Sequence, residues 1–277
     1  MIGQISCNFM SEQKVCLTIA GLDPSGGAGI IADIKTFTAF GCFGTAAISS
    51  VTFQNTTGVF GAVHQDAASI RGQVEAVLDD LDVSAVKTGM LPTREVIEET
   101  ARIAAERNIS NLVVDPVVRS TSGYDLIEDA ALRVLIENLF PLSLVVTPNL
   151  QEAERISGLK IDTVDKIGSA AKIMLSMGAA NVLMKGGHLT AADTEKRAVD
   201  RLYSQDGSCL EFEAEYIETT ATHGTGCTLA AAITANLALG HGLQASVSAA
   251  KEFVTRAIRT STGLGRGHSP INITPSA

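Results

Sequence analysis

The chain has 277 residues, 45% of them hydrophobic, and a formal net charge of −9 from 21 Lys and Arg against 30 Asp and Glu. This acidic balance argues against a nucleic-acid-binding protein, which normally carries a basic stripe. Aromatic residues make up only 4% and Trp is absent, so the core must be built from Ala, Val, Ile and Leu, which suit buried parallel strands covered by helices.

The five cysteines are widely spread and form no Cys-x-x-Cys pair, which argues against a zinc site or a disulfide framework. Residues 1–14 form a polar tail without the apolar stretch of a secretory signal, and no apolar run is long enough to span a membrane. We therefore expect a cytoplasmic protein with reduced thiols and a single domain over residues 15–277, without nucleic-acid or membrane partners.

Short β-rich runs alternate with segments of helical periodicity along most of the chain. In the helical segments 70–81, 96–104 and 167–174, apolar residues recur every three or four positions and so share one helix face. The alternation is typical of βαβ units and predicts an α/β fold with a mostly parallel sheet. The expected strands are 16–20, 46–52, 85–87, 112–115, 144–147 and 182–185.

The last third of the chain follows a different pattern. Strand-like segments 200–203 and 209–217 flank a polar turn, which predicts an antiparallel hairpin at one edge of the sheet. The polar stretch 190–197 is expected to be a surface loop, and 58–64 is a candidate flap. Two closing helices are expected near 226–239 and 243–262.

Polar or glycine-rich turns follow each of the expected parallel strands. In open α/β sheets, ligands bind beyond the carboxyl ends of the strands, so these turns predict one binding rim. They are 21–29, 54–56, 88–90, 115–116, 147–149 and 185–188.

The turn at 222–228 reads Thr-His-Gly-Thr-Gly-Cys-Thr and leads directly into an apolar helix. A helix start has unpaired N–H groups and partial positive charge, and glycines let an anion approach closely, so the turn could hold phosphate. The alternative is a glycine-rich cap on a core helix. Cys227 itself could be a buried small side chain, a partner of His223 in a Cys–His dyad, or a base whose thiolate the helix start favours.

Other candidates on the rim also have two interpretations. Asp33 is a solvated helix carboxylate, which its sequence favours, or an acceptor for a ligand. Gln54 offers a donor and an acceptor that suit an aminopyrimidine edge, or it stabilises a turn. Asn149 and Glu152 lie one helical turn apart and could hold Mg²⁺ through water, or form an ordinary helix start. Lys185 could steady a transferring phosphoryl group, or be solvated.

Taken together, these motifs resemble the ribokinase-like superfamily and, within it, the hydroxymethylpyrimidine/phosphomethylpyrimidine kinases of thiamine biosynthesis. The matching segments occur in the family's order: 17–29, 32–37, 54–56, 87–91, 114–117, 147–150, 184–188 and 222–228. The resemblance implies a three-layer α/β/α sandwich and a homodimer. It also implies that ATP phosphorylates the hydroxymethyl group of 4-amino-5-hydroxymethyl-2-methylpyrimidine, and in many members then its monophosphate.

The resemblance also implies roles for individual residues. The pyrimidine would contact Gln54 and Asp33, in a pocket lined by Gly21, Ala28, Met90 and Val117. Asn149 and Glu152 would lie near Mg²⁺ and phosphate, with Asp115 and Glu152 holding the metal through water, and Lys185 near the nucleotide phosphates. Gly224, Thr225 and Gly226 would form the anion hole, and Cys227 would stand where most sugar kinases of the superfamily have a catalytic Asp.

Two positions depart from the family pattern and leave the substrate range open. Phe53 stands where a small residue is more usual, and would stack on the pyrimidine or pack behind it. Val118 and Arg119 stand where Met is common. The alternatives are a kinase of pyridoxine, pyridoxal or pyridoxamine with the same fold, a Cys–His hydrolase or acyltransferase, and a metabolite sensor without catalysis.

Overall fold

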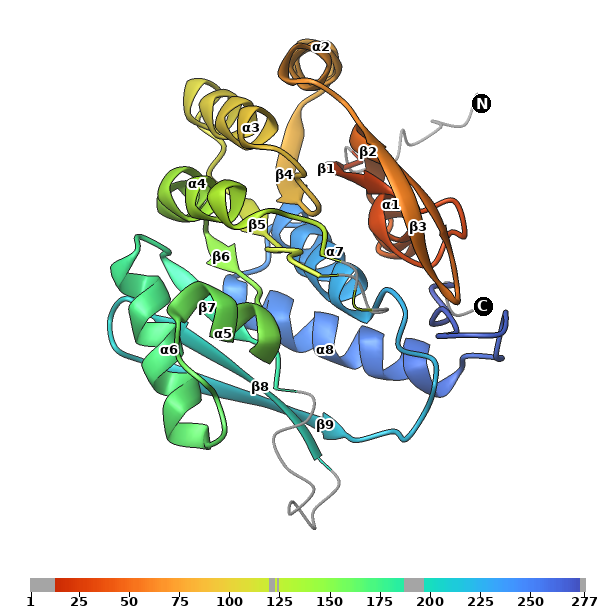
Figure 1. Cartoon of the computed structure of the whole chain (residues 1–277), viewed down its shortest axis with the longest axis vertical. Helices are drawn as coiled ribbons and strands as arrows, with labels where there is room; N and C mark the ends of the chain where they lie inside the picture. The colour runs from red at the N-terminus through yellow and green to blue at the C-terminus, as the bar shows by residue number, and fades with distance from the viewer. Residues whose placement is uncertain (1–12, 120–122, 124, 187–196, 275–277) are drawn as a thin grey trace, which may run out of the picture.

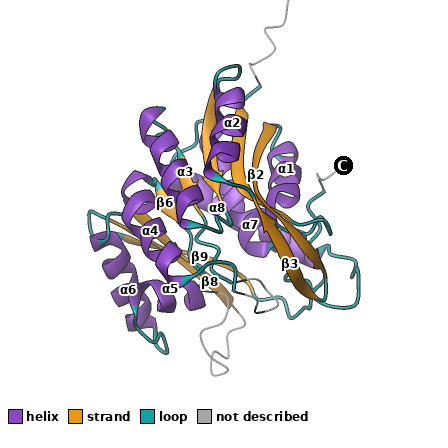
Figure 2. Ribbon diagram, turned by 45° about the horizontal axis from the view of Figure 1, so that its top comes forward, coloured by secondary structure: helices purple, strands orange, loops and turns teal. Residues whose placement is uncertain are grey.

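The computed structural model describes residues 13–119, 123, 125–186 and 197–274. These residues form one nine-stranded sheet in the order β3-β2-β1-β4-β5-β6-β7-β8-β9, with helices on both faces (Figures 1 and 2). The expected tail at 1–14 and the surface loop at 190–197 lie almost entirely outside the described residues.

The centre of the sheet is parallel, as its buried apolar strands predict. Pairing runs from β2 through β1 and β4 to β7 without a change of direction. All six strands expected from the sequence are therefore present. They are β1 (Val15–Leu22), β2 (Phe43–Asn55), β4 (Val83–Thr88), β5 (Leu112–Val114), β6 (Val145–Val146) and β7 (Asn181–Met184).

Both edges of the sheet are antiparallel, whereas the sequence predicts only one such edge. The predicted hairpin is present as β8 (Arg197–Ser204) and β9 (Cys209–Glu215), paired onto β7. At the other edge, β3 (Gly58–His64) runs antiparallel to β2. The segment suggested as a flap is thus an edge strand of the sheet.

Helices cover the two faces in separate groups, giving the expected three layers. One core lies under α2 to α6 and the other under α1, α7 and α8. The first group is α2 (Ala67–Leu78), α3 (Arg94–Glu106), α4 (Asp129–Leu139), α5 (Leu150–Ser157) and α6 (Val164–Ser176), with a short 3₁₀ turn at Phe140–Leu142. The second group is α1 (Gly29–Ala39), α7 (Thr225–Ala238) and α8 (Leu243–Arg259).

The central strands supply side chains to both cores because successive residues point to opposite faces. In β5, Leu112 and Val114 join the core under α2 to α6, while Val113 joins the other. Helix α7 is buried along nearly its whole length, so its start is held rigidly at the rim of the sheet.

The segment after α8 returns to the β2–β3 turn. The backbone N–H of His268 donates to the Thr56 carbonyl over 2.8 Å, and the N–H of Arg266 donates to the Thr56 hydroxyl. This contact fixes the end of the edge hairpin beside the predicted rim. Among the described helices, none combines the length and apolar character needed to cross a membrane.

Candidate active site

The carboxyl ends of the parallel strands and the start of α7 open into one cavity of about 1070 Å³. All but one of the site residues expected from the sequence line it. They are Gly21, Ala28, Gln54, Met90, Asp115, Val117, Asn149, Glu152, Lys185, Gly224, Thr225, Gly226 and Cys227. The exception is Asp33.

The two glycine-rich turns of the cavity pack backbone against backbone. Gly224 has a left-handed φ of +83°, and a Cβ there would overlap the carbonyl oxygen of Gly27. Gly29 has a φ of +56° and is similarly close to the Gly21 carbonyl. Only glycine combines this backbone conformation with such close approach.

Helix α7 begins at Thr225 with Gly224 as its N-cap residue. Among the described residues, no side chain caps this helix. The Thr225 N–H donates to the Thr222 carbonyl over 3.4 Å, and the N–H groups that follow it are left to a ligand. The helix dipole adds partial positive charge at the same point. This geometry suits an anion such as a phosphate.

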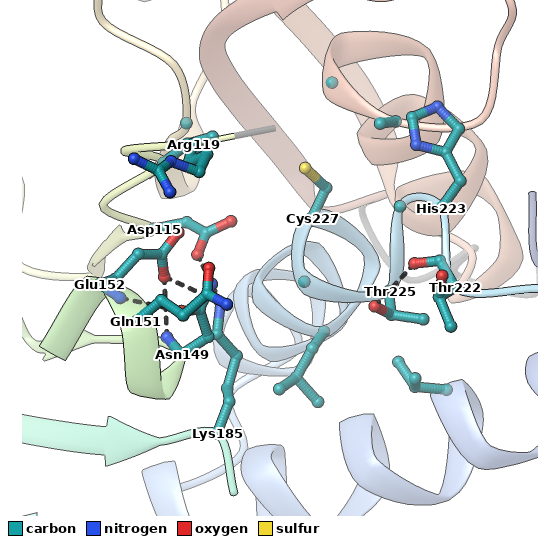
Figure 3. Close-up of a pocket in the computed structure, with 18 of the residues that line it drawn as sticks. Asp115, Arg119, Asn149, Gln151, Glu152, Lys185, Thr222, His223, Thr225 and Cys227 are labelled. Atoms are coloured by element: carbon teal, nitrogen blue, oxygen red, sulfur yellow. Dashed lines mark hydrogen bonds and ion pairs between the residues drawn. The ribbon is translucent and has the colours of Figure 1, made fainter. Parts of the chain in front are cut away.

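His223 binds Asp23 rather than Cys227. Its Nε2 lies 2.7 Å from Asp23 Oδ2, and both side chains are almost fully buried. In Figure 3, the Cys227 thiol and the His223 ring point into different parts of the site. The Cys–His dyad considered from the sequence is therefore wrong, and with it the basis for a hydrolase.

Burial raises the pKa of the Cys227 thiol to about 11, and the charges of Asp115 and Asp33 add to that effect. Lys87 and the backbone N–H of Gly29 oppose it. Desolvation therefore outweighs the neighbouring groups that favour the thiolate.

Asp115, Glu152 and Lys185 form a charged cluster on the side of the cavity opposite His223 (Figure 3). Lys185 Nζ lies 2.9 Å from Asp115 Oδ1 and 3.8 Å from Glu152 Oε2. Thr147 also donates a hydrogen bond to Asp115 over 3.0 Å. Lys185 is largely buried, so the solvated alternative is wrong.

The cluster sets the charge of its own members. Burial raises the pKa of Glu152 to about 7; the charge of Asp115 adds to this, and Lys185 opposes it. Burial would also raise the pKa of Asp115, but the attraction of Lys185 and Lys87 lowers it overall. Burial works against the charge of Lys185, yet Asp115 and Glu152 raise its pKa.

Asn149 and Glu152 form a capping box at the start of α5. The Asn149 side chain accepts from the Glu152 N–H over 2.9 Å, and the Glu152 carboxylate accepts from the Asn149 N–H over 2.7 Å. The helix-start alternative is therefore correct for their local contacts. The same cap holds the Glu152 carboxylate at the cavity wall.

The donor set of this cluster fits Mg²⁺ bound partly through water. Asp115 and Glu152 supply hard carboxylate oxygens, and Mg²⁺ commonly uses one or two carboxylates with water and substrate phosphates. Among the described residues there is no group of three or more His, Cys, Asp or Glu side chains that could hold a metal alone. A closed protein cage is therefore not the arrangement that these residues offer.

The other end of the cavity is formed by β1, β2 and the turn after β4. Gln54 is engaged by the Thr52 hydroxyl at 3.2 Å and lies 3.4 Å from His223 Nε2. The Met90 sulfur packs close to Gly21. The amide is thus held by neighbours on two sides and not left as a free turn residue.

Phe53 lies outside this site. Its side chain is 54% exposed and contacts Gly61 on β3. Both expectations for Phe53, stacking on a pyrimidine and packing behind one, are therefore wrong. Thr52, its neighbour on β2, lines the cavity, and adjacent strand residues point to opposite faces of the sheet.

Asp33 is neither solvated nor exposed to the cavity. Its side chain is completely buried, accepts from Thr18 over 2.7 Å and pairs with Lys87 over 2.9 Å. A direct contact between Asp33 and a substrate is excluded in this conformation. Lys87, which the sequence interpretation did not single out, lines the cavity instead.

Arg119 is another cavity residue for which the sequence predicts no role. It lines the cavity and lies across from Cys227 in Figure 3. Its guanidinium pairs with Asp125 over 2.9 Å. Its sequence signals were a cation three residues after the expected turn at 115–116 and a departure from the family pattern at Val118 and Arg119.

The family model and the relatives in sequence point to one family. The family model for phosphomethylpyrimidine kinase matches residues 23–272. The chain is 43% identical to the hydroxymethylpyrimidine/phosphomethylpyrimidine kinase of Haemophilus influenzae, over 95% of this chain and 97% of that protein.

Solved structures confirm the ribokinase-like fold. The phosphomethylpyrimidine kinase of Clostridium difficile has a TM-score of 0.77 at 42% identity, covering 89% of this chain and all of that one. The pyridoxal kinase of Staphylococcus aureus, in complex with AMP-PCP and pyridoxal, has a TM-score of 0.85 at 32% identity. That match covers 95% of this chain and 94% of the other.

Proposed function

The chain belongs to the phosphomethylpyrimidine kinase family, and on that premise we propose that it phosphorylates hydroxymethylpyrimidine with ATP and then its monophosphate to the diphosphate. The observation that carries this proposal is that an uncapped helix start and a Lys–carboxylate cluster lie side by side in one cavity. The chain is a kinase of thiamine biosynthesis by family.

Charge stabilisation is assigned to the helix start and to the lysine beside it. The N–H groups at Gly224, Thr225 and Gly226 bind the transferring phosphoryl group, the Thr225 N–H in exchange for the Thr222 carbonyl, and Lys185 approaches it next to Gly226. A Cβ on Gly226 would lie only 3.2 Å from Lys185 Nζ, which supports their common action. Phosphoryl transfer depends mainly on positioning and charge neutralisation, so these groups make the largest contribution.

Mg²⁺ is proposed to bind with ATP beside Asp115 and Glu152, through water and phosphate oxygens. When bound, the ion neutralises phosphate charge. Asn149 holds Glu152 in place through the capping box. The pKa of Glu152, about 7 beside Lys185 and without a metal ion, supports a carboxylate whose charged form is stabilised when Mg²⁺ binds.

Gln54 is proposed to hydrogen-bond the aminopyrimidine, between Gly21, Ala28, Met90 and Val117. Asp33 is not part of this contact. Cys227 is proposed as the base that takes the hydroxyl proton of the substrate. The thiol must first lose its own proton, and a loose transition state requires little from a base.

Pyridoxal phosphorylation is the second candidate, since the fold resembles that of a pyridoxal kinase solved in complex with AMP-PCP and pyridoxal. An aminopyrimidine offers Gln54 a donor and an acceptor side by side, which favours it over pyridoxal. A metabolite sensor without catalysis would bind the pyrimidine and leave ATP unchanged.

A homodimer is proposed as well, and the exposed apolar side chains of the β2–β3 hairpin support it. Val51 and Val63 are cross-strand neighbours, and Val63, Phe53 and Phe60 are 54%, 54% and 67% exposed. Apolar edge strands are seldom left open to water.

The protein is expected to act in the cytoplasm, and its net charge of −9 supports small-molecule substrates rather than nucleic acid.

The assembly is tested by light scattering after chromatography. Phe53→Ser with Val63→Ser should yield monomers, and Val164→Ser, an equally exposed apolar residue at the start of α6, should not. A wild-type monomer would overturn the homodimer.

The reaction is tested by following hydroxymethylpyrimidine, ATP and Mg²⁺ with phosphorus NMR. The monophosphate should appear first and the diphosphate after it. Absence of any phosphorylated pyrimidine at saturating substrate would refute the kinase assignment. Accumulation of monophosphate alone would refute only the second step.

A further inference from the structure

Asp200 on β8 is a buried carboxylate that binds the turn after β7. Its Oδ1 accepts from the backbone N–H of Gly186 over 3.0 Å, and its Oδ2 pairs with Lys251 on α8 over 2.8 Å. Both side chains of the pair are largely buried, and both residues line the cavity. The carboxylate thus joins β8, α8 and the end of β7 at the cavity wall.

The backbone at the end of β7 is held from two sides. The Lys185 N–H donates to the Pro148 carbonyl over 2.9 Å, just before α5. One residue later, the Gly186 N–H donates to Asp200, and a Cβ on Gly186 would overlap the Val199 carbonyl oxygen. Lys185 therefore leaves a backbone that is fixed to α5 on one side and packed directly against β8 on the other.

The position of this turn decides where the ammonium group of Lys185 lies. Its Nζ reaches Asp115 and Glu152, and a Cβ on Gly226 would lie 3.2 Å from it (Figure 3). A lysine is a point charge on a flexible stem, so its place depends on the backbone from which it starts. A misplacement of about 1 Å in a site that positions phosphate can lower the rate by about 100-fold.

A purely structural role would fasten β8 to α8 through the ion pair between Asp200 and Lys251. Such a role needs no contact with the turn after β7. In this structure the carboxylate binds Lys251 with one oxygen and the Gly186 N–H with the other. The second contact is the one that reaches the active-site lysine.

We propose that Asp200 is a positioning residue for phosphoryl transfer, which acts through the Gly186 N–H to hold Lys185 beside the start of α7. This inference rests on the proposed kinase function, in which Lys185 approaches the phosphoryl group. The hydrogen bond to Gly186 carries the effect, and Lys251 balances the charge of the buried carboxylate. Asp200 itself needs no contact with the nucleotide.

The test compares two double variants that both remove the charges of the pair. Asp200→Asn/Lys251→Met keeps a side-chain oxygen for the Gly186 N–H, whereas Asp200→Leu/Lys251→Met has a similar shape and no acceptor. Any effect of losing Lys251 is common to both. Glu213→Ala is the control for the β8–β9 hairpin, because Glu213 pairs with Arg197 at the surface over 2.7 Å.

The first readout is the Kd of AMP-PCP with Mg²⁺, measured by titration calorimetry. We expect the Leu variant to bind about ten-fold or more weakly than the Asn variant, and Glu213→Ala to bind like wild type. In a Lys185→Met background, the same exchange of Asn for Leu should change Kd by less than about two-fold, because the lysine through which Asp200 acts is gone. The kcat should follow the same pattern, with KM for hydroxymethylpyrimidine unchanged within about two-fold.

Kd values of the Asn and Leu variants that agree within about two-fold would overturn the inference and leave the pair a structural one. A difference that persists in the Lys185→Met background would overturn it as well, since Asp200 would then act without this lysine. If the Leu variant does not fold, Asp200→Ala/Lys251→Met takes its place, because water can then reach the Gly186 N–H without fixing the turn. Binding of AMP-PCP requires no acceptor, so the inference is tested even if hydroxymethylpyrimidine is not phosphorylated.

Discussion

His223 Nε2 lies 2.7 Å from Asp23 Oδ2, which joins residues 200 positions apart in the chain. The same carboxylate accepts from the Ala28 N–H over 2.9 Å and so also closes the glycine-rich turn after β1. The pair therefore fixes the turn at 222–228 to the glycine-rich turn after β1. The proposed phosphate and substrate sites would be held at one distance by this contact.

Replacing Asp23 with Asn should loosen that connection. The variant loses the charge that pairs with His223, and we expect the free energy of unfolding to fall by about 1–3 kcal/mol. The kcat should fall more than either KM rises, because alignment is lost rather than binding. Asp66→Asn is the control, since Asp66 caps α2 far from the cavity and Asn caps a helix equally well. Equal activity in the two variants would contradict this role.

Gly224→Ala tests the close approach of the two turns. The left-handed φ costs about 1–2 kcal/mol for any residue with a Cβ, and overlap with the Gly27 carbonyl adds to this. We expect a lower Tm and near loss of kcat. Gly72→Ala, in the exposed interior of α2 with open space around it, should instead raise stability by about 0.5–1 kcal/mol. An active, stable Gly224→Ala would refute the assigned geometry.

Gln54→Ala tests the pyrimidine contact. We expect KM for hydroxymethylpyrimidine to rise by about ten-fold or more, which corresponds to about 1.4 kcal/mol, with KM for ATP unchanged. The control is Gln205→Ala in the β8–β9 turn, whose side chain bonds the Leu175 and Ala179 carbonyls away from the cavity. A pyrimidine KM unaffected by Gln54→Ala would show that the amide serves only its own turn.

Much of the fold could be predicted because its central strands are short apolar runs separated by helical periodicity. The edge strand β3 was missed because Gly58 and Gly61 weaken its strand signal, and because a two-residue turn leaves little to separate it from β2. The binding rim followed from strand order alone, since parallel strands bring their carboxyl ends together.

The charges inside the site could not be predicted. The helix that carries Asp33 contains both apolar and polar residues, so its sequence does not show which side is buried. The burial of Asp33 depends on Lys87, which lies 54 positions away. The proximity of Cys227 and His223 in sequence suggested a dyad, but one side chain lies before the helix and the other inside its first turn. The spacing of two residues along the sequence does not predict which way their side chains point on a tight turn.

The pH dependence of kcat tests Cys227 as a base. With its pKa raised to about 11, the thiol is protonated at neutral pH, whereas a base must be deprotonated. Below that pKa, kcat/KM, which reports the free enzyme, should rise by about ten-fold for each pH unit as the thiolate fraction rises, and kcat should follow the pKa of the enzyme–substrate complex. Cys227→Ser should remove this slope and lower kcat far more than it changes substrate KM, and Cys209→Ser should preserve both. The same profile in wild type and Cys227→Ser would make Cys227 a packing residue.

The most direct test of the proposed function is a competition between hydroxymethylpyrimidine and pyridoxal at equal concentration. ATP and Mg²⁺ are present in excess, so that they limit the phosphorylation of neither substrate. The ratio of the two phosphorylated products gives the ratio of kcat/KM values. We expect at least about ten-fold more phosphorylated pyrimidine. A mixture dominated by pyridoxal phosphate would contradict the assignment of this site to a pyrimidine substrate.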